Sequence, residues 1–107
     1  MNRIEEDLPA GAWPRFDVDR GQEVVFVAED LSVRTWTCPH CGPKTFHAPK
    51  FRATRAQLLQ LELQIAARVP KGSELRVLRC APADADGREE WTMHAAVEHS
   101  SPMLAGD

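Results

Sequence analysis

Two cysteines separated by two residues, Cys38 and Cys41, constrain this chain more than any other feature of its sequence. This spacing holds both thiols within one turn, where they can bind a single metal ion or close a small disulfide. Gly42 follows the second cysteine and lets such a turn close. We therefore expect a tight turn at this point, entered from a strand that ends at Cys38.

The cysteine content and the N-terminal sequence favour a reducing compartment. The chain has 107 residues, which fits one domain, and its three cysteines are an odd number that does not suit a disulfide framework. Residues 1–7 are acidic and lack the apolar segment of a secretory signal, and no apolar run is long enough to cross a membrane. We expect a cytoplasmic protein, in which a thiol pair is more often a metal site or a redox centre.

The thiol pair predicts a structural Zn²⁺ site that ligands from elsewhere in the chain complete. Residues 38–42 resemble one half of a zinc ribbon or zinc knuckle, and a closed zinc site needs four ligands. Cys80 is the expected third ligand because it lies where a strand ends, although a buried apolar thiol is the simpler explanation of this residue. The expected fourth ligand is His47, with His94 as the alternative. The predicted metal ligands are therefore Cys38, Cys41, Cys80 and His47.

A redox function is the alternative interpretation of the same turn. Cys-Pro-His-Cys is also the dithiol sequence of the strongly oxidising thioredoxin-like disulfide oxidases, and the chain is similar to thioredoxin in length. The resemblance implies thiol–disulfide exchange at Cys38 and Cys41. In that family the second cysteine continues into a helix whose N-terminus lowers the pKa of the first thiol. Here Gly42, Pro43 and Pro49 oppose a helix, which favours zinc.

The order of strand, turn and helix signals predicts a small α+β domain. Thr54 and Gln57 form a capping box at the start of a helix, and Asp86–Gly87 marks a hairpin turn between two strands. Prolines and glycines oppose regular structure over residues 38–50. The expected fold is a four-stranded, mostly antiparallel sheet with one main helix and a zinc-knuckle-like turn. Its parts are an extended arm (1–21), a zinc-binding domain (22–98) with strands at 22–28, 31–37, 73–80 and 90–97 and a helix at 54–68, and a flexible tail (99–107).

The predicted helix has a wider apolar surface than one buried face requires. Apolar residues cover more than half of its circumference and leave a narrow polar stripe. Either the sheet and the N-terminal arm clamp this helix from two sides, or part of the surface, including Leu59 and Leu63, binds another protein. A second copy of the chain would be one such partner, which predicts a homodimer through residues 54–69.

The segment 34–55 is basic, although the whole chain carries a net charge of −3. No acidic residue lies between Asp30 and Glu62. Either carboxylates from the rest of the fold neutralise this segment, or it binds an anionic partner. Trp36 lies among these charges and can stack on unpaired bases, so single-stranded nucleic acid is a candidate partner. The basic residues of the segment are Arg34, Lys44, Lys50, Arg52 and Arg55.

The sequence contains no nucleotide-binding loop, nucleophile elbow or zinc-protease motif, so we expect no enzyme of those classes. We expect a small zinc-stabilised protein-interaction module, such as an accessory subunit, an adaptor or an inhibitor that acts on a larger protein complex. The first alternative is a zinc-ribbon-like module that binds nucleic acid through residues 34–55. The second is a thioredoxin-like thiol–disulfide protein.

Overall fold

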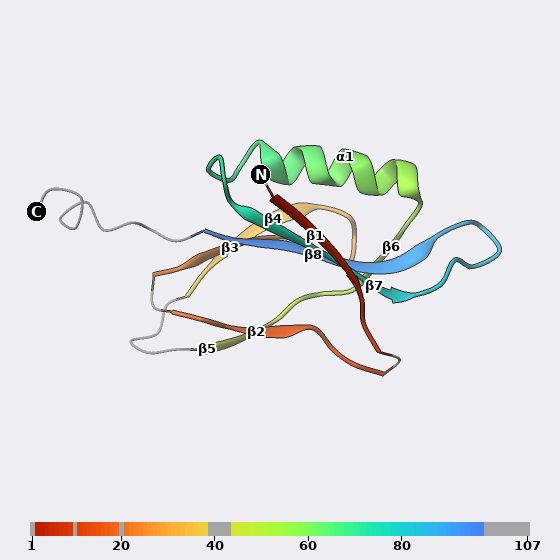
Figure 1. The fold of residues 1–107 in the computed structure, drawn as a ribbon, viewed down its shortest axis with the longest axis horizontal. Coiled ribbons are helices and arrows are strands. Elements are labelled where there is room, and N and C mark those ends of the chain that lie inside the picture. The colour runs from red at the N-terminus through yellow and green to blue at the C-terminus, as the bar shows by residue number, and fades with distance from the viewer. Residues whose placement is uncertain (1, 10, 20, 39–43, 98–107) are drawn as a thin grey trace, which may run out of the picture.

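The computed structural model describes residues 2–9, 11–19, 21–38 and 44–97, and these residues form three layers (Figure 1). One helix covers one face of a central sheet, and a two-stranded ribbon, β2–β5, lies against the other face. The described part of the chain is thus a small α+β domain. Its elements are β1 (Asn2–Asp7), β2 (Arg15–Val18), β3 (Glu23–Val27), β4 (Val33–Thr37), β5 (Lys44–His47), β6 (Phe51–Ala53), α1 (Arg55–Ala66), β7 (Glu74–Ala81) and β8 (Glu89–Val97).

The central sheet is organised around its longest strand, β8. The strand order is β1-β7-β8-β3-β4, and β6 pairs with the first residues of β8 while β3 pairs with its last ones. The hairpins predicted for residues 22–37 and 73–97 are confirmed, because β3 pairs with β4 and β7 pairs with β8 in antiparallel orientation. Side chains alternate along β8, so Trp91 and Met93 face α1 whereas Thr92 and His94 face the ribbon.

The predicted count of four strands was too low. Among the described residues the central sheet has six strands, and the ribbon adds two more. The segment predicted as an arm supplies β1, which pairs in parallel with β7 along its whole length, and β2. The segment predicted to be irregular, residues 38–50, supplies β5. These strands are short or highly charged, and long-range backbone pairing stabilises them where local propensity does not.

The helix begins as the sequence predicts. The Thr54 hydroxyl accepts a hydrogen bond from the backbone N–H of Gln57, and the Gln57 side chain accepts one from the backbone N–H of Thr54, which completes the capping box. Only one face of α1 is buried, and the segment that was predicted as an N-terminal arm does not cover the opposite face. Instead, β1 contacts the helix through an ion pair between Arg3 and Glu62. Within the described ranges no helix is long and apolar enough to cross a membrane.

Two apolar clusters hold the three layers together. The larger one lies between the sheet and α1 and includes Trp91, Phe51 and Ile65. The smaller one lies between the sheet and the ribbon, where Val18, Val24 and Cys38 are buried among partly buried aromatic rings. The ribbon is short and covers only part of its face of the sheet (Figure 1). Two hollows are lined in part by its residues. The aromatic rings around the smaller cluster are Phe16, Phe26, Trp36 and Phe46.

Candidate functional site

Cys38 lies directly after β4, as the sequence predicts, and only 2% of it is exposed. Its backbone N–H donates to the carbonyl oxygen of Gln22 at 3.0 Å, and its carbonyl oxygen accepts from the N–H of Gly21 at 3.1 Å. These bonds fix the entry to the predicted turn. Cys41 itself falls outside the described residues.

The predicted pairing of Cys38 with Cys80 at one metal ion does not fit the strand register. Cys38 follows the end of the sheet where Glu23 of β3 pairs with Val97 of β8. Cys80 lies at the other end of β8, where the next residue of β7 pairs with Glu90. At the usual rise per residue, these two ends of β8 are more than about 20 Å apart. Two thiolates that bind one zinc ion must each lie at about 2.3 Å from it, so the described register does not bring Cys80 to the position expected of a third ligand beside Cys38.

The two histidines considered as ligands also lie away from Cys38. His47 is exposed at the end of β5 and points away from the face that Phe46 buries against the sheet. His94 is opposite Phe26 of β3, four residues along that strand from the end near Cys38. Among the residues that the structure describes, no three His, Cys, Asp or Glu side chains come together as a metal site. The predicted ligand set is therefore not assembled in the described part of the chain.

Cys80 is half-buried, and burial raises the pKa of its thiol. A thiol that resists ionisation is a weak nucleophile, so this environment is typical of a structural cysteine. A thioredoxin-like site would require a helix that begins at the second cysteine, and the described residues after Cys41 begin with a strand instead. The chain enters β5 at Lys44, three residues after Cys41, whereas α1 begins only at Arg55.

The basic segment is largely neutralised within the fold. Arg34 pairs with Asp30 at 3.1 Å, and Arg52 pairs with Asp84 at 2.9 Å. Arg55 contacts Glu89 at 2.9 Å; this carboxylate is buried and also pairs with a second arginine. Trp36 is half-buried and packs on Phe46, with 5.2 Å between the ring centroids, so one face of its ring is already covered. The ion pairs leave fewer cations for phosphate groups, and the packing of Trp36 leaves less of its ring for stacking on a base.

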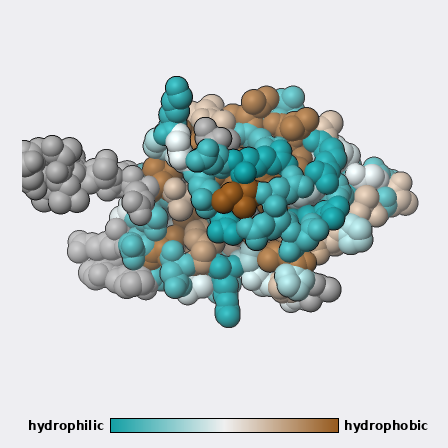
Figure 2. Space-filling model, in the orientation of Figure 1, coloured by the Kyte–Doolittle hydropathy of each residue, from teal (hydrophilic) through white to brown (hydrophobic). Residues whose placement is uncertain are grey.

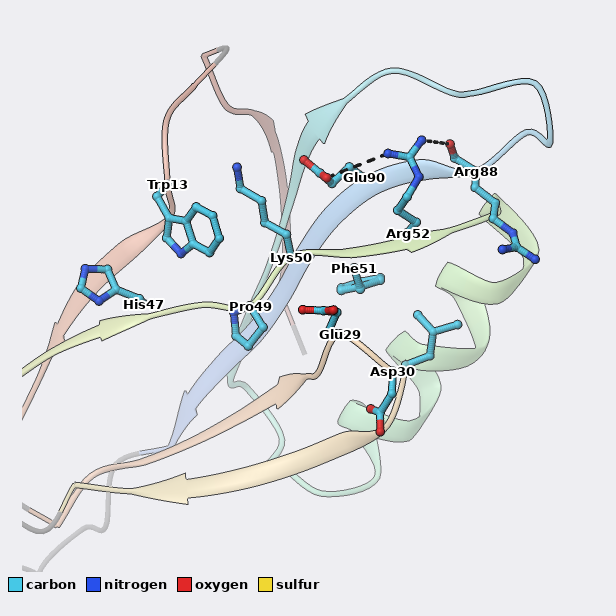
Figure 3. Close-up of a pocket in the computed structure, with 11 residues that line it drawn as sticks. Trp13, Glu29, Asp30, His47, Pro49, Lys50, Phe51, Arg52, Arg88 and Glu90 are labelled. Carbon is cyan, nitrogen blue, oxygen red and sulfur yellow. Dashed lines mark hydrogen bonds and ion pairs between the residues drawn. The ribbon is translucent and has the colours of Figure 1, made fainter.

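A cleft of about 900 Å³ lies between the ribbon, β6 and the turn after β3. We call it the Trp13 cleft. Trp13 forms one rim with 54% of its surface exposed, and the Lys50 ammonium lies 4.5 Å from the centre of its ring (Figure 3). Glu29 and Asp30 come from the turn after β3 (Figure 3). The other lining residues that bear on its chemistry are His47, Pro49, Phe51, Arg52, Arg88 and Glu90.

The cleft has an apolar floor and charged sides. Arg52 is already bonded to Glu90 and to the carbonyl oxygen of Arg88 (Figure 3). The side chains of Glu29 and Arg88, by contrast, make no ion pair with any residue in the described ranges. The sequence signal for this site was an isolated tryptophan in a proline- and glycine-rich segment. That signal did not reveal the cleft, because the other walls come from distant parts of the chain.

A separate apolar surface lies on the helix. Leu59 and Leu63 are 57% and 64% exposed, and their i, i+4 spacing places them on the same face of α1. Figure 2 shows apolar residues over the part of the molecule where Figure 1 places α1, within a surface that is otherwise mostly hydrophilic. These leucines are two of the residues that the sequence predicted for partner binding.

No protein-family model matches the chain, and neither a curated protein nor a solved structure is significantly similar to it. The fold therefore defines the class of the protein only as a mixed α+β domain, with a concave site beside an exposed tryptophan. Any function must be argued from the chemistry of its surface.

Proposed function

We propose that this chain is a protein-interaction module whose Trp13 cleft binds an extended segment of a larger protein. The observation that carries the proposal is a tryptophan that stays half exposed at the rim of a cleft of about 900 Å³. Tryptophan is the residue most enriched among interface positions that dominate binding energy. The Lys50 ammonium lies over its ring at 4.5 Å, which favours the orientation that the ring has at the rim.

The charges around the cleft indicate what kind of segment would bind. The side chains of Glu29 and Arg88 make no ion pair within the described residues, and they flank a floor formed by Pro49 and Phe51. A segment with an apolar side chain between a basic and an acidic residue would satisfy both charges and cover the Trp13 ring. An accessory subunit, an adaptor or an inhibitor of a protein complex would use such a surface.

Other proposed partners have less support. The ion pairs of Arg34, Arg52 and Arg55 leave the basic segment few free cations for phosphate groups, which are the main source of affinity for nucleic acids. The strand that follows Cys41 removes the main structural support for a thioredoxin-like site. A homodimer through residues 54–69 stays a prediction, and it would bury Leu59 and Leu63.

Selection of random peptides tests the proposal directly. We expect peptides selected on the wild-type protein to share an apolar residue flanked by opposite charges, and Trp13→Ala to abolish their binding. Loss of the aromatic anchor should weaken binding by more than about 2 kcal/mol, which is roughly thirtyfold. Titration of labelled peptide, followed by fluorescence anisotropy, gives the affinities.

Two further variants locate the binding surface in this experiment. Glu29→Lys reverses one charge at the cleft and should weaken peptides with a basic residue on that side, while Leu63→Lys on the helix should leave all affinities unchanged. If Leu63→Lys removes binding and Trp13→Ala does not, the cleft is not the site of interaction. Failure to select any peptide would count against the proposal as a whole.

The Zn²⁺ prediction is now confined to the Cys38–Cys41 turn. Replacing Cys38 with serine places a hydroxyl among Val18 and Val24, which alone should cost about 1–3 kcal/mol. A bound ion that links Cys38 to Cys41 would add to this loss, because metal binding stabilises the folded state. We expect native mass spectrometry to show one zinc ion per chain, and a chelator to lower the Tm of the wild type but not of Cys38→Ser. Metal-free protein with an unchanged Tm would contradict the prediction.

A further inference from the structure

The outer face of α1 carries a regularly spaced row of exposed apolar residues, which we call the α1 seam. Its members follow one another at spacings of three, four and three residues. This is the spacing of the a and d positions through which two helices pack in a coiled coil. The side chains that α1 buries against the sheet, Leu58, Leu61 and Ile65, lie on another side of the helix, so the fold itself does not cover the seam. The α1 seam consists of Ala56, Leu59, Leu63 and Ala66.

The order of side chains along the α1 seam is the same in both directions: small, large, large, small. If two antiparallel copies of α1 cross at the middle of the seam, Leu59 lies opposite Leu63 of the second copy, and Ala56 lies opposite Ala66. A two-fold interface brings the same patch of both subunits together in this way. The N-terminal end of each helix, which carries a partial positive charge, then lies near the C-terminal end of the other. The seam is therefore complementary to a second copy of itself.

The charges beside the α1 seam are already paired within one chain. The charged residues of α1 are Arg55 and Glu62, and both flank the seam on the same side. Arg55 contacts Glu89 at 2.9 Å, and the Arg3 guanidinium donates to both carboxylate oxygens of Glu62 at 2.8 Å. In a symmetric contact each charge approaches its own copy, and unpaired like charges would oppose the contact. Arg3 offsets this repulsion at Glu62, and the neutral Gln60 on the other flank can hydrogen-bond to its own copy.

The edges of the central sheet are less suited to a second copy than the helix is. A small sheet can self-associate through its edge strands, which in the described part of the chain are β1 and β4. The side chains of β1 are mostly charged, and charged side chains oppose pairing between edges. At β4, the Arg68 guanidinium donates to the carbonyl oxygen of Val33 at 2.9 Å and so occupies a backbone acceptor. The outer face of α1, by contrast, presents uncovered leucines (Figure 2).

We propose that the α1 seam pairs two copies of this chain in an antiparallel, two-fold symmetric dimer. Leu59 and Leu63 of the two copies form the centre of the contact, and the alanines at its ends let the two backbones approach closely. The helix has 12 residues and is about 18 Å long, so the contact is small and the dimer is weak and dependent on concentration. The seam shares no residue with the Trp13 cleft, so either proposal can fail without the other.

Sedimentation equilibrium at concentrations up to the millimolar range tests the dimer. We expect the apparent mass to rise toward twice that of the monomer, and Leu63→Lys to weaken association at least about tenfold, because it places an ammonium against Leu59 of the second copy. Leu63 is 64% exposed, so this variant should keep the Tm of the wild type. Gln64→Lys is the matched control, since it adds the same charge at an exposed position outside the seam and should not change association. A monomer at all concentrations, or equal association of wild type and Leu63→Lys, would overturn the proposal.

A mixture of two variants tests the antiparallel orientation. In an antiparallel pair of Leu63→Lys with Leu59→Glu, the introduced ammonium faces the introduced carboxylate, and the other central layer keeps its two leucines. We expect the equimolar mixture to associate at least about tenfold more tightly than either variant alone. In a parallel pair each introduced charge would face a leucine, so the mixture would gain nothing. A mixture that associates no better than the separate variants would show that the antiparallel pairing is wrong.

Discussion

Trp91→Ala will lower the free energy of unfolding by about 3–5 kcal/mol. Trp91 is fully buried in the cluster between the sheet and α1, where it pairs across the strands with Phe51 of β6. The Arg55 guanidinium covers its ring at 4.7 Å, so truncation removes a cation–π contact as well as apolar packing. A domain of this size has about 5–15 kcal/mol of total stability, so the variant should be close to unfolding.

Urea unfolding followed by circular dichroism measures this loss. Trp13→Ala is the matched control, since it removes the same side chain from an exposed position and should change the stability by less than about 1 kcal/mol. Trp91→Phe should fall between the two, because the indole Nε1 has no hydrogen-bond partner among the described residues and the change therefore removes packing alone. A Trp91→Ala protein as stable as Trp13→Ala would contradict the packing described above.

Acidification should destabilise the protein through His94. Burial, together with the charge of the nearby Arg76, lowers the pKa of this histidine from 6.5 to about 4. Between these two values the unfolded chain binds a proton that the folded chain does not, so stability falls as the pH drops from about 6.5 to about 4. The contribution lost is about 3 kcal/mol, at 1.36 kcal/mol for each unit of pKa difference, and no more is lost from this group below the folded pKa.

Many carboxylates titrate in the same pH range. Comparison with His94→Phe separates the contribution of His94 to the pH dependence of stability from theirs. Phenylalanine preserves an aromatic ring next to Phe16 but binds no proton. Both proteins lose the same carboxylate contributions, so the difference between their unfolding free energies at pH 7 and near pH 4 reports His94. We expect that difference to change by about 3 kcal/mol in favour of the variant at low pH. Parallel curves for the two proteins would show that His94 is not held neutral by burial.

The sequence was sufficient to predict the local elements that carry their own signals. The capping box at Thr54 placed the start of α1. The β-branched run in residues 22–28 indicated β3 of the hairpin β3–β4, and the Asp86–Gly87 turn signal placed the hairpin β7–β8. It was not sufficient for β1, where five of the six residues are polar or charged. That strand exists because β7, about seventy residues later, pairs with it and supplies Arg79 to Asp7. No local pattern contains such a partner.

Cys38 and Cys80 lie far apart in the described residues for a related reason. Cys38 and Cys80 each lie at the end of a strand, as predicted, but a strand has two ends. The pairing register between β8 and β3 determines how the two hairpins are aligned along the strand direction. This alignment places the two thiols at opposite ends of the sheet. The periodicity of apolar residues in a sequence predicts which face of the sheet a residue occupies. It does not predict how far two paired strands are shifted along each other. The pockets were missed likewise, because their walls come from strands far apart in the chain.

Trp13 forms a wall of both hollows, the Trp13 cleft and a smaller one of about 250 Å³ beside His94. A partner that fixed the Trp13 ring from the side of one hollow would also change the surface that lines the other. By reciprocity, any ligand of the smaller hollow that changed the affinity for a protein segment in the Trp13 cleft by some factor would have its own affinity changed by the same factor.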